Sequence, residues 1–344
     1  MPDMLTHYTF AKERMMDVPD EYKQVVYLGT QGPDMFLCYG DSKRYGKTRK
    51  MVKEVKKFGS KCHNDDIAYT YPVMFEYAKN SPYKDMLFCY LDGLFMHYCV
   101  DSACHPYVCT KAGWVFPETD PNIYVRGHSM VEYGIDIVYP TRHNTFTIHP
   151  YDVLDCKEEY VKEISKMWDY FNKNTYKDEC INEDTYFQGK QDYYYRMREQ
   201  NKNRLLSYLK GVVFADKLTS DYYTHYMKKP LRKTRKFDFL NDKKETWKCL
   251  WDGQEHSESF EELMDQAFEK YKVTHSLVLR AKEGEDVKED LIKFTNNINH
   301  TGYYCDYDYS KAIVSSPLPP DGYDIFGNKV TKFRLKHCRL YKRS

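Results

Sequence analysis

The sequence predicts an all-α fold, because apolar residues recur three and four positions apart along long stretches of the chain. One such stripe runs over residues 154–171 and another over 205–213. A third, over 260–271, follows Ser259, which together with Glu262 matches the capping box that starts many helices. This periodicity predicts amphipathic helices that pack around a shared core.

Signals for β-strands are weak before about residue 300. From Tyr303 onward the sequence predicts loops or a small hairpin, because prolines are concentrated between Ser315 and Pro320. We therefore expect a compact multi-helix domain over residues 1–290 and a partly irregular C-terminal extension over 291–344, to which the sequence assigns no role.

The composition excludes several classes of protein. A formal net charge of +1 gives no overall attraction to nucleic acid or to an anionic membrane. A stretch of about 18 apolar residues, which a transmembrane helix needs, is absent, and so is a secretory signal. The eleven cysteines form no CxxC pair. These features favour the reducing cytoplasm and free thiols, and the basic run 228–236 is expected on a solvated loop.

The most informative segment spans residues 93–105, where His97, Asp101 and His105 follow one another at intervals of four. On a helix this spacing places the three side chains on one face. His128 and Glu132 repeat the interval further along the chain. Imidazole nitrogens and carboxylate oxygens are ligands that zinc prefers, so the two pairs together predict a metal site.

Each of these residues taken alone has a simpler interpretation. A single histidine on an apolar helix face is commonly a hydrogen-bonded core residue, and a single aspartate is commonly a partner in an ion pair. Burying several ionisable groups without a cation is costly, however, because buried charges need partners. Three further candidates precede the main segment: His7, Asp34 and His63.

The order and spacing of these residues resembles the zinc-dependent phospholipase C family, which includes single-strand-specific nucleases. The resemblance covers residues 1–140. It depends on four segments: Thr6-His7, Gly32-Pro33-Asp34, His97-Tyr98-Cys99-Val100-Asp101 with His105, and His128-Ser129-Met130-Val131-Glu132 followed by Asp136. It implies a helical zinc hydrolase fold.

The resemblance also implies two or three bound zinc ions. One would be held by Asp34, His63, His97 and Asp101. A second would be held by His105, His128 and Glu132. The third would be held by Pro2, His7 and Asp101, with the Pro2 amine exposed after removal of Met1.

The implied activity is hydrolysis of a phosphoester bond by a metal-activated water, with Asp34 as the catalytic residue that orients or deprotonates that water. The expected substrate is a small phosphoester or a phospholipid, and no stable nucleic-acid partner is expected. Choline-specific members of the family carry a tyrosine after the aspartate, whereas this chain has Met35. Two alternatives remain: a nucleotide phosphodiesterase or nuclease, and a zinc-binding protein without turnover.

Overall fold

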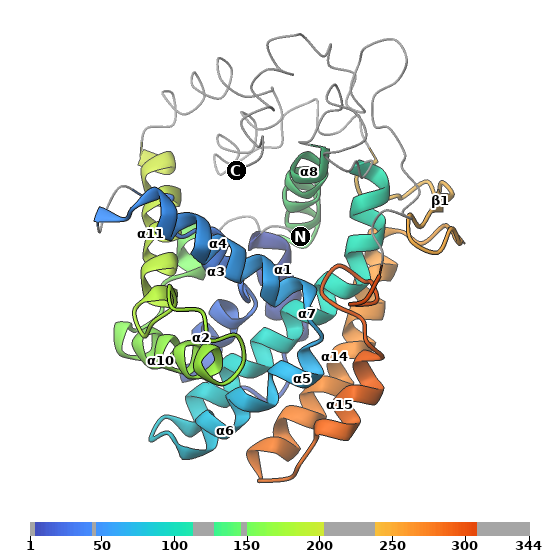
Figure 1. Ribbon diagram of the computed structural model, residues 1–344. Coiled ribbons are helices and arrows are strands. Elements are labelled where there is room, and N and C mark those ends of the chain that lie inside the picture. Colours follow the sequence, from blue (N-terminus) through green and yellow to red (C-terminus); the bar gives the residue numbers. More distant parts are fainter. Residues whose placement is uncertain (1–3, 43–45, 113–126, 146–149, 203–237, 308–344) are drawn as a thin grey trace.

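The computed structural model describes residues 4–42, 46–112, 127–145, 150–202 and 238–307, and these ranges confirm the all-α prediction (Figure 1). The helices of the first half are α1 (Met4–Arg14), the 3-10 helix η1 (Asp20–Tyr22), α2 (Lys23–Gly29), α3 (Asp34–Leu37), α4 (Arg49–Asn64), α5 (Ile67–Thr70), α6 (Pro72–Asn80) and α7 (Lys84–Ala112). Those that follow are α8 (Gly127–Arg142), α9 (Pro150–Val153), α10 (Glu158–Asn174), α11 (Thr185–Lys202), α14 (Phe260–Lys282) and α15 (Lys288–Thr295).

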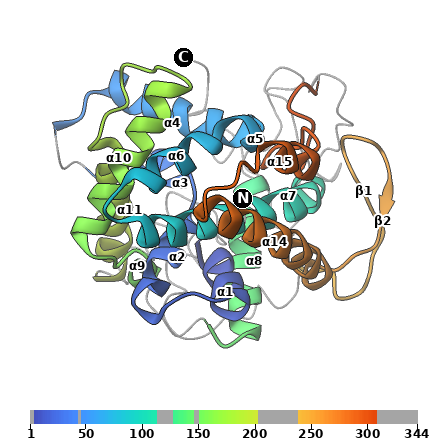
Figure 2. The same ribbon diagram turned by 90° about the horizontal axis from the view of Figure 1, so that it is seen from below.

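Helix α7 is the central element of the fold. It is 29 residues long and is buried along almost its whole length. Figures 1 and 2 both show it running through the middle of the molecule, with α14 on one side and α10 and α11 toward the other. It packs most extensively against α14, α2 and α8. A helix that is apolar on every side belongs in a core, so the residues of the predicted metal face are carried into the interior.

The crossing of α2 and α7 depends on two glycines that face each other. A Cβ added to Gly29 would lie 2.4 Å from the Tyr90 carbonyl oxygen, and one added to Gly93 would lie 2.3 Å from that of Val26. Any side chain at either position would collide with backbone, so only glycine allows this approach. The close crossing places Thr30, the residue that follows α2, beside the next turn of α7.

The predicted apolar stripes are present on two helices. Ser259 caps α14, and its capping box with Glu262 is formed in both directions. The stripe over 154–171 lies mainly on α10, whose apolar residues, from Val161 to Phe171, are buried. The third predicted stripe, over 205–213, lies outside the described residues.

A short hairpin precedes α14, and an irregular segment follows α15. Strands β1 (Trp247–Lys248) and β2 (Glu255–His256) pair antiparallel, which the weak strand signals before residue 300 did not predict. The domain boundary expected near residue 290 falls inside α15, and the chain then continues to an antiparallel bridge between Ile298 and Tyr304. Among the described helices, none is long and apolar enough to cross a membrane.

Candidate metal centre

Helix α7 presents His97, Asp101 and His105 toward one region of the interior, as the interval of four predicts. All three side chains are buried, and Asp101 is completely inaccessible to solvent. The candidate ligands contributed by other elements come from α1, α3, α4, α8 and the segment after α15. Five separated parts of the chain therefore meet at this face of α7.

Four imidazoles surround the Asp101 carboxylate. The Nε2 atom of His97 lies 3.2 Å from Oδ2, and the Nε2 atom of His7 lies 3.3 Å from Oδ1. The Nδ1 atoms of His300 and His105 lie 3.7 Å from Oδ2 and 3.9 Å from Oδ1, respectively. The rings of His7 and His97 also stack, with centroids 4.5 Å apart. A single buried carboxylate thus has histidines on several sides.

The candidate ligands form two groups. Within each group, the ligand atoms all lie within 4.8 Å of one another. Group A consists of His63, His97, Asp101 and His300. Group B consists of His105, His128 and Glu132. In group B the His128 Nε2 atom is 2.7 Å from Glu132 Oε1, and the rings of His105 and His128 stack with centroids 5.7 Å apart. Group B therefore unites the three residues expected to bind the second zinc.

Asp34, at the first position of α3, is next to group A. Its Oδ1 atom lies 3.2 Å from the Nε2 atom of His63. Asp34, the residue predicted to be catalytic, thus lies beside a histidine of group A. The sequence predicted Asp34 as the fourth ligand beside His63, His97 and Asp101, whereas the group of close ligand atoms in the structure has His300 in that place.

Backbone carbonyl groups fix the tautomers of three of these histidines. In each case the ring Nδ1 donates a hydrogen bond to a carbonyl oxygen, which can only accept. The bonds run from His63 to Gly59 (2.7 Å), from His97 to Thr30 (2.9 Å) and from His105 to His300 (2.7 Å). In a neutral imidazole the proton then resides on Nδ1 and the Nε2 lone pair is free to bind a metal. Metal-binding histidines are commonly held in this way.

The resulting arrangement brings polar atoms without hydrogen-bond partners together inside the core. Within the described residues, the atoms His63 Nε2, His97 Nε2, His300 Nδ1, both ring nitrogens of His7, Asp34 Oδ1 and both Asp101 oxygens have no hydrogen-bond partner. An unsatisfied buried polar group costs ~1–3 kcal/mol, more for a charged one. A divalent cation would satisfy several of these atoms at once, so the donor set fits a metal ion.

The electrostatic environment favours the ligand forms of Asp101 and of three histidines, whereas the charge of Asp101 outweighs burial at His97 and raises the pKa of that imidazole. Burial raises the pKa of Asp101, but the charges of His97 and His105 outweigh it and hold the pKa well below its usual range. Burial lowers the pKa of His105 and of His300 to about 3. It also lowers the pKa of His128 well below its usual value. Asp101 is thus a carboxylate, and these three imidazoles are neutral, at physiological pH.

The candidate ligands differ in their access to solvent. The side chain of His128 is 29% exposed, that of Asp34 16% and that of Glu132 11%, whereas those of His97, Asp101 and His300 are fully buried. His128, Asp34 and Glu132 are therefore more accessible to solvent than the ligands of group A.

His300 is the residue that sequence reasoning missed. It comes 195 residues after His105, outside any helix and without a second ligand at helical spacing. The backbone places it: its N–H donates to the His63 carbonyl oxygen over 3.2 Å. Its Nε2 atom lies 3.3 Å from the Tyr71 hydroxyl, so Nδ1 is the ring nitrogen that faces Asp101. Sequence spacing contains no signal for such a residue.

The remaining predicted residues divide into described and undescribed ones. Pro2 lies outside the described residues, so only His7 and Asp101 of the third predicted site can be placed. The carboxylate of Asp136 accepts a hydrogen bond from the Thr6 backbone N–H over 2.6 Å, which fixes the helix that carries His7. Met35, after Asp34, is fully buried. The basic run 228–236 and the end of the extension, 308–344, also lie outside the described residues.

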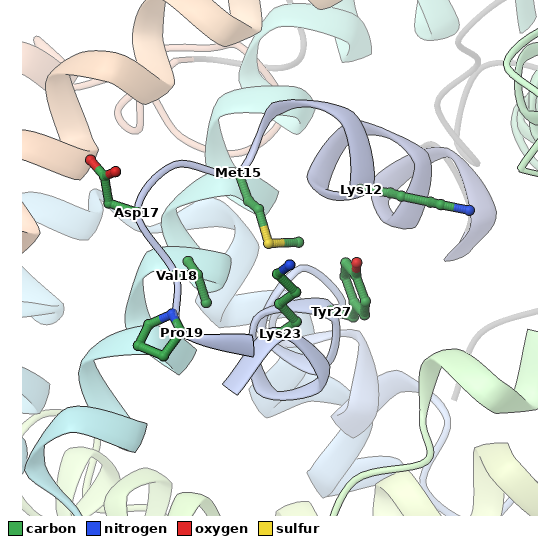
Figure 3. A pocket seen from close by; sticks show the side chains of 7 residues that line it. All are labelled: Lys12, Met15, Asp17, Val18, Pro19, Lys23 and Tyr27. Atoms are coloured by element: carbon green, nitrogen blue, oxygen red, sulfur yellow. The ribbon is translucent and has the colours of Figure 1, made fainter. Parts of the chain in front are cut away.

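A separate cavity of about 590 Å³ opens where the chain passes from α1 to α2. Figure 3 shows Lys23 and Tyr27 pointing from α2 toward Met15 across this cavity. The residues that line it are Lys12, Met15, Asp17, Val18, Pro19, Lys23 and Tyr27. None of the candidate metal ligands is among them, so this cavity is distinct from the metal centre.

In comparisons with known proteins, the chain matches no family model, no curated protein and no solved structure.

Proposed function

We propose that this protein binds zinc at groups A and B and hydrolyses phosphoester bonds. One observation carries the proposal: the Nε2 lone pair of His97, oriented by the Thr30 carbonyl, faces the fully buried carboxylate of Asp101 at 3.2 Å. Two acceptors at this distance repel each other unless a cation lies between them, either a proton on His97, whose pKa Asp101 raises, or a metal ion that takes its place. The same carbonyl-fixed geometry recurs at His63 and His105.

The donor atoms favour zinc over calcium and magnesium. Both groups combine imidazole nitrogens with one carboxylate, whereas calcium and magnesium take oxygen ligands almost exclusively. Group A offers four protein ligands, the number found in closed zinc sites, and group B offers three, the number found in catalytic zinc sites. Group B, which includes the exposed edge of His128, is therefore the better candidate for contact with a substrate.

The proposed chemistry assigns separate tasks to the residues. Zinc supplies Lewis acidity and lowers the pKa of water toward ~7, as phosphoester hydrolysis at neutral pH requires. Asp34 is accessible to solvent beside His63, so its carboxylate orients the attacking water and accepts its proton. Asp101, a ligand of group A, stays ionised and also lies 3.9 Å from the Nδ1 atom of His105 in group B, so it fixes the relative position of the two groups.

The burial of group A also supports a second candidate, a zinc-binding protein without turnover. His97, Asp101 and His300 are inaccessible to solvent, as the ligands of a structural zinc site commonly are. The two candidates differ in whether group B and Asp34 act on a substrate.

The test combines metal analysis with an activity assay on the purified chain. We expect at least two zinc ions per chain and cleavage of the chromogenic diester bis(4-nitrophenyl) phosphate that a chelator abolishes and added zinc restores. A panel of phospholipids, nucleotides and single-stranded nucleic acid then identifies the substrate class. Full zinc occupancy without cleavage of any of these would contradict the hydrolase proposal and support the structural alternative.

The substitution Asp34→Asn tests the assigned role. It should abolish turnover while the zinc content and the helical circular dichroism stay close to wild type. Asp169→Asn is the matched control, because Asp169 is similarly buried but pairs with Lys173 on α10, away from the centre. Retained turnover in Asp34→Asn would refute the role of Asp34.

A further inference from the structure

We infer that residue 300 serves both metal groups at once, so that zinc binding at group A strengthens zinc binding at group B. The inference rests on the metal-binding part of the proposed function and does not require turnover. The ring of His300 belongs to group A, and its backbone carbonyl orients His105 of group B. Among the described residues, no other supplies a side-chain ligand to one group and a backbone carbonyl that orients a ligand of the other.

The ring of His300 is oriented so that Nδ1 faces group A. Its Nε2 atom is next to the Tyr71 hydroxyl at 3.3 Å, while Nδ1 lies 3.7 Å from Asp101 Oδ2. Nδ1 is the ring nitrogen nearer to the backbone, because it is bonded to the carbon that joins the ring to Cβ. A metal ligated through Nδ1 is therefore only a few bonds from the main chain of residue 300 and restrains that main chain closely.

The main chain of residue 300 also determines which ring nitrogen His105 offers to a metal at group B. The His105 Nδ1–H donates to the His300 carbonyl oxygen over 2.7 Å, which leaves Nε2 as the ligand atom. Removing an outer hydrogen-bond partner of a metal-binding histidine typically costs 10–100-fold in metal affinity. If the carbonyl is held less firmly, group B should thus lose affinity although its own three side chains are unchanged.

Contacts on both sides hold the segment in place. The N–H of His300 donates to the His63 carbonyl oxygen over 3.2 Å, at the end of α4. The Tyr98 hydroxyl, on α7, donates to the Ile298 carbonyl oxygen over 2.8 Å. The side chain of Asn299 donates to the Asn64 carbonyl oxygen over 3.2 Å. We call residues 298–302 the clasp, because they tie α4 to α7 beside both groups.

The coupling has a thermodynamic consequence that can be measured. If zinc at group A raises the affinity of group B by some factor, zinc at group B must raise the affinity of group A by the same factor. Repulsion between the two cations opposes this effect, so the contribution of the clasp is seen by comparing variants that leave the charges of the centre unchanged.

The experiment measures both stepwise zinc dissociation constants of the full chain by competition with a chromophoric chelator. In His300→Ala we expect both dissociation constants to rise. That of group A should rise because a ligand is lost, and that of group B should rise by about 10-fold or more because the carbonyl that orients His105 is held less firmly. If one of the two constants stays within about twofold of wild type, the coupling is refuted. If the wild-type chain binds no zinc, the proposed function fails instead.

A second pair of variants leaves every metal ligand in place. Tyr98→Phe removes the hydrogen bond to the clasp, and we expect both zinc constants to weaken. Tyr107→Phe is the matched control: Tyr107 is also a buried tyrosine of α7 that donates to a distant backbone carbonyl, that of Phe239, over 2.9 Å. Its zinc constants should equal those of wild type. If Tyr98→Phe and Tyr107→Phe have the same zinc dissociation constants, the proposed role of the clasp is refuted.

Discussion

Replacing Asp101 by asparagine tests the metal centre most directly, because this carboxylate lies among four imidazoles and has no hydrogen-bond partner among the described residues. Asparagine has nearly the same shape but carries no charge, so the packing of α7 is preserved. We expect the variant to fold and to lose most of the stabilisation that zinc gives to the wild-type protein.

The size of the loss follows from binding linkage. A ligand present at 1,000 times its dissociation constant stabilises the folded state by about 4.1 kcal/mol. A 100-fold weaker site retains about 1.4 kcal/mol at the same zinc concentration, so Asp101→Asn should lose about 2.7 kcal/mol at group A alone. In a chain of 344 residues, with an unfolding entropy of ~2.1 cal/mol/K per residue, that corresponds to roughly 4 °C in the midpoint of thermal unfolding.

The assay compares thermal unfolding with zinc and with a chelator, for wild type and variant. Asp92→Asn is the control, because Asp92 is also a buried aspartate of α7 but pairs with His275 at 2.9 Å and with Tyr271 at 2.7 Å. It should lower the midpoint equally with and without zinc, so its zinc increment stays at the wild-type value. If Asp101→Asn keeps the full wild-type increment, Asp101 does not take part in metal binding.

Two further predictions concern a glycine and a buried ion pair. Gly32 has φ +49°, and a Cβ there would lie 2.4 Å from the His97 ring. Gly32→Ala should therefore weaken zinc binding and cost ~1–3 kcal/mol, whereas Gly46→Ala, with φ +57° and no atom within 4 Å, should cost only the backbone strain and leave zinc binding unchanged. Burial lowers the pKa of His275, but its hydrogen bond to Asp92 outweighs burial and raises that pKa. Because the pKa of His275 is higher in the folded state than in the unfolded state, the stability lost in His275→Gln should be largest below pH ~6.5 and shrink as the pH rises through the raised pKa. Urea unfolding of the wild type and the variant at several pH values measures this loss. A loss of stability that grows with pH would contradict the prediction.

The sequence predicted the part of the centre that depends on helix geometry alone. Four-residue spacing places His97, Asp101 and His105 on one face of any helix, and the pair His128 and Glu132 follows the same rule. The capping box at Ser259 is local in the same sense. Such features survive tertiary packing because they are determined within one or two turns of the chain.

The parts that the sequence did not predict are determined by long-range packing. His300 reaches group A only because the chain after α15 returns to the end of α4. The hydrogen bond from His97 to the Thr30 carbonyl requires α2 and α7 to approach as closely as Gly29 and Gly93 allow. Neither contact leaves a pattern in the sequence, because a lone histidine or glycine has many simpler explanations.

The location of the centre suggests how folding and metal binding depend on each other. The α2–α7 crossing places the Thr30 carbonyl, and the clasp places the His300 carbonyl, so two histidines of α7 are oriented by backbone from opposite ends of the chain. These carbonyls are positioned only when the core is assembled, whereas the acceptors gathered around Asp101 oppose that assembly until a cation binds. Metal affinity and core stability are therefore linked, and a core substitution such as Gly93→Ala should weaken zinc binding without touching a ligand.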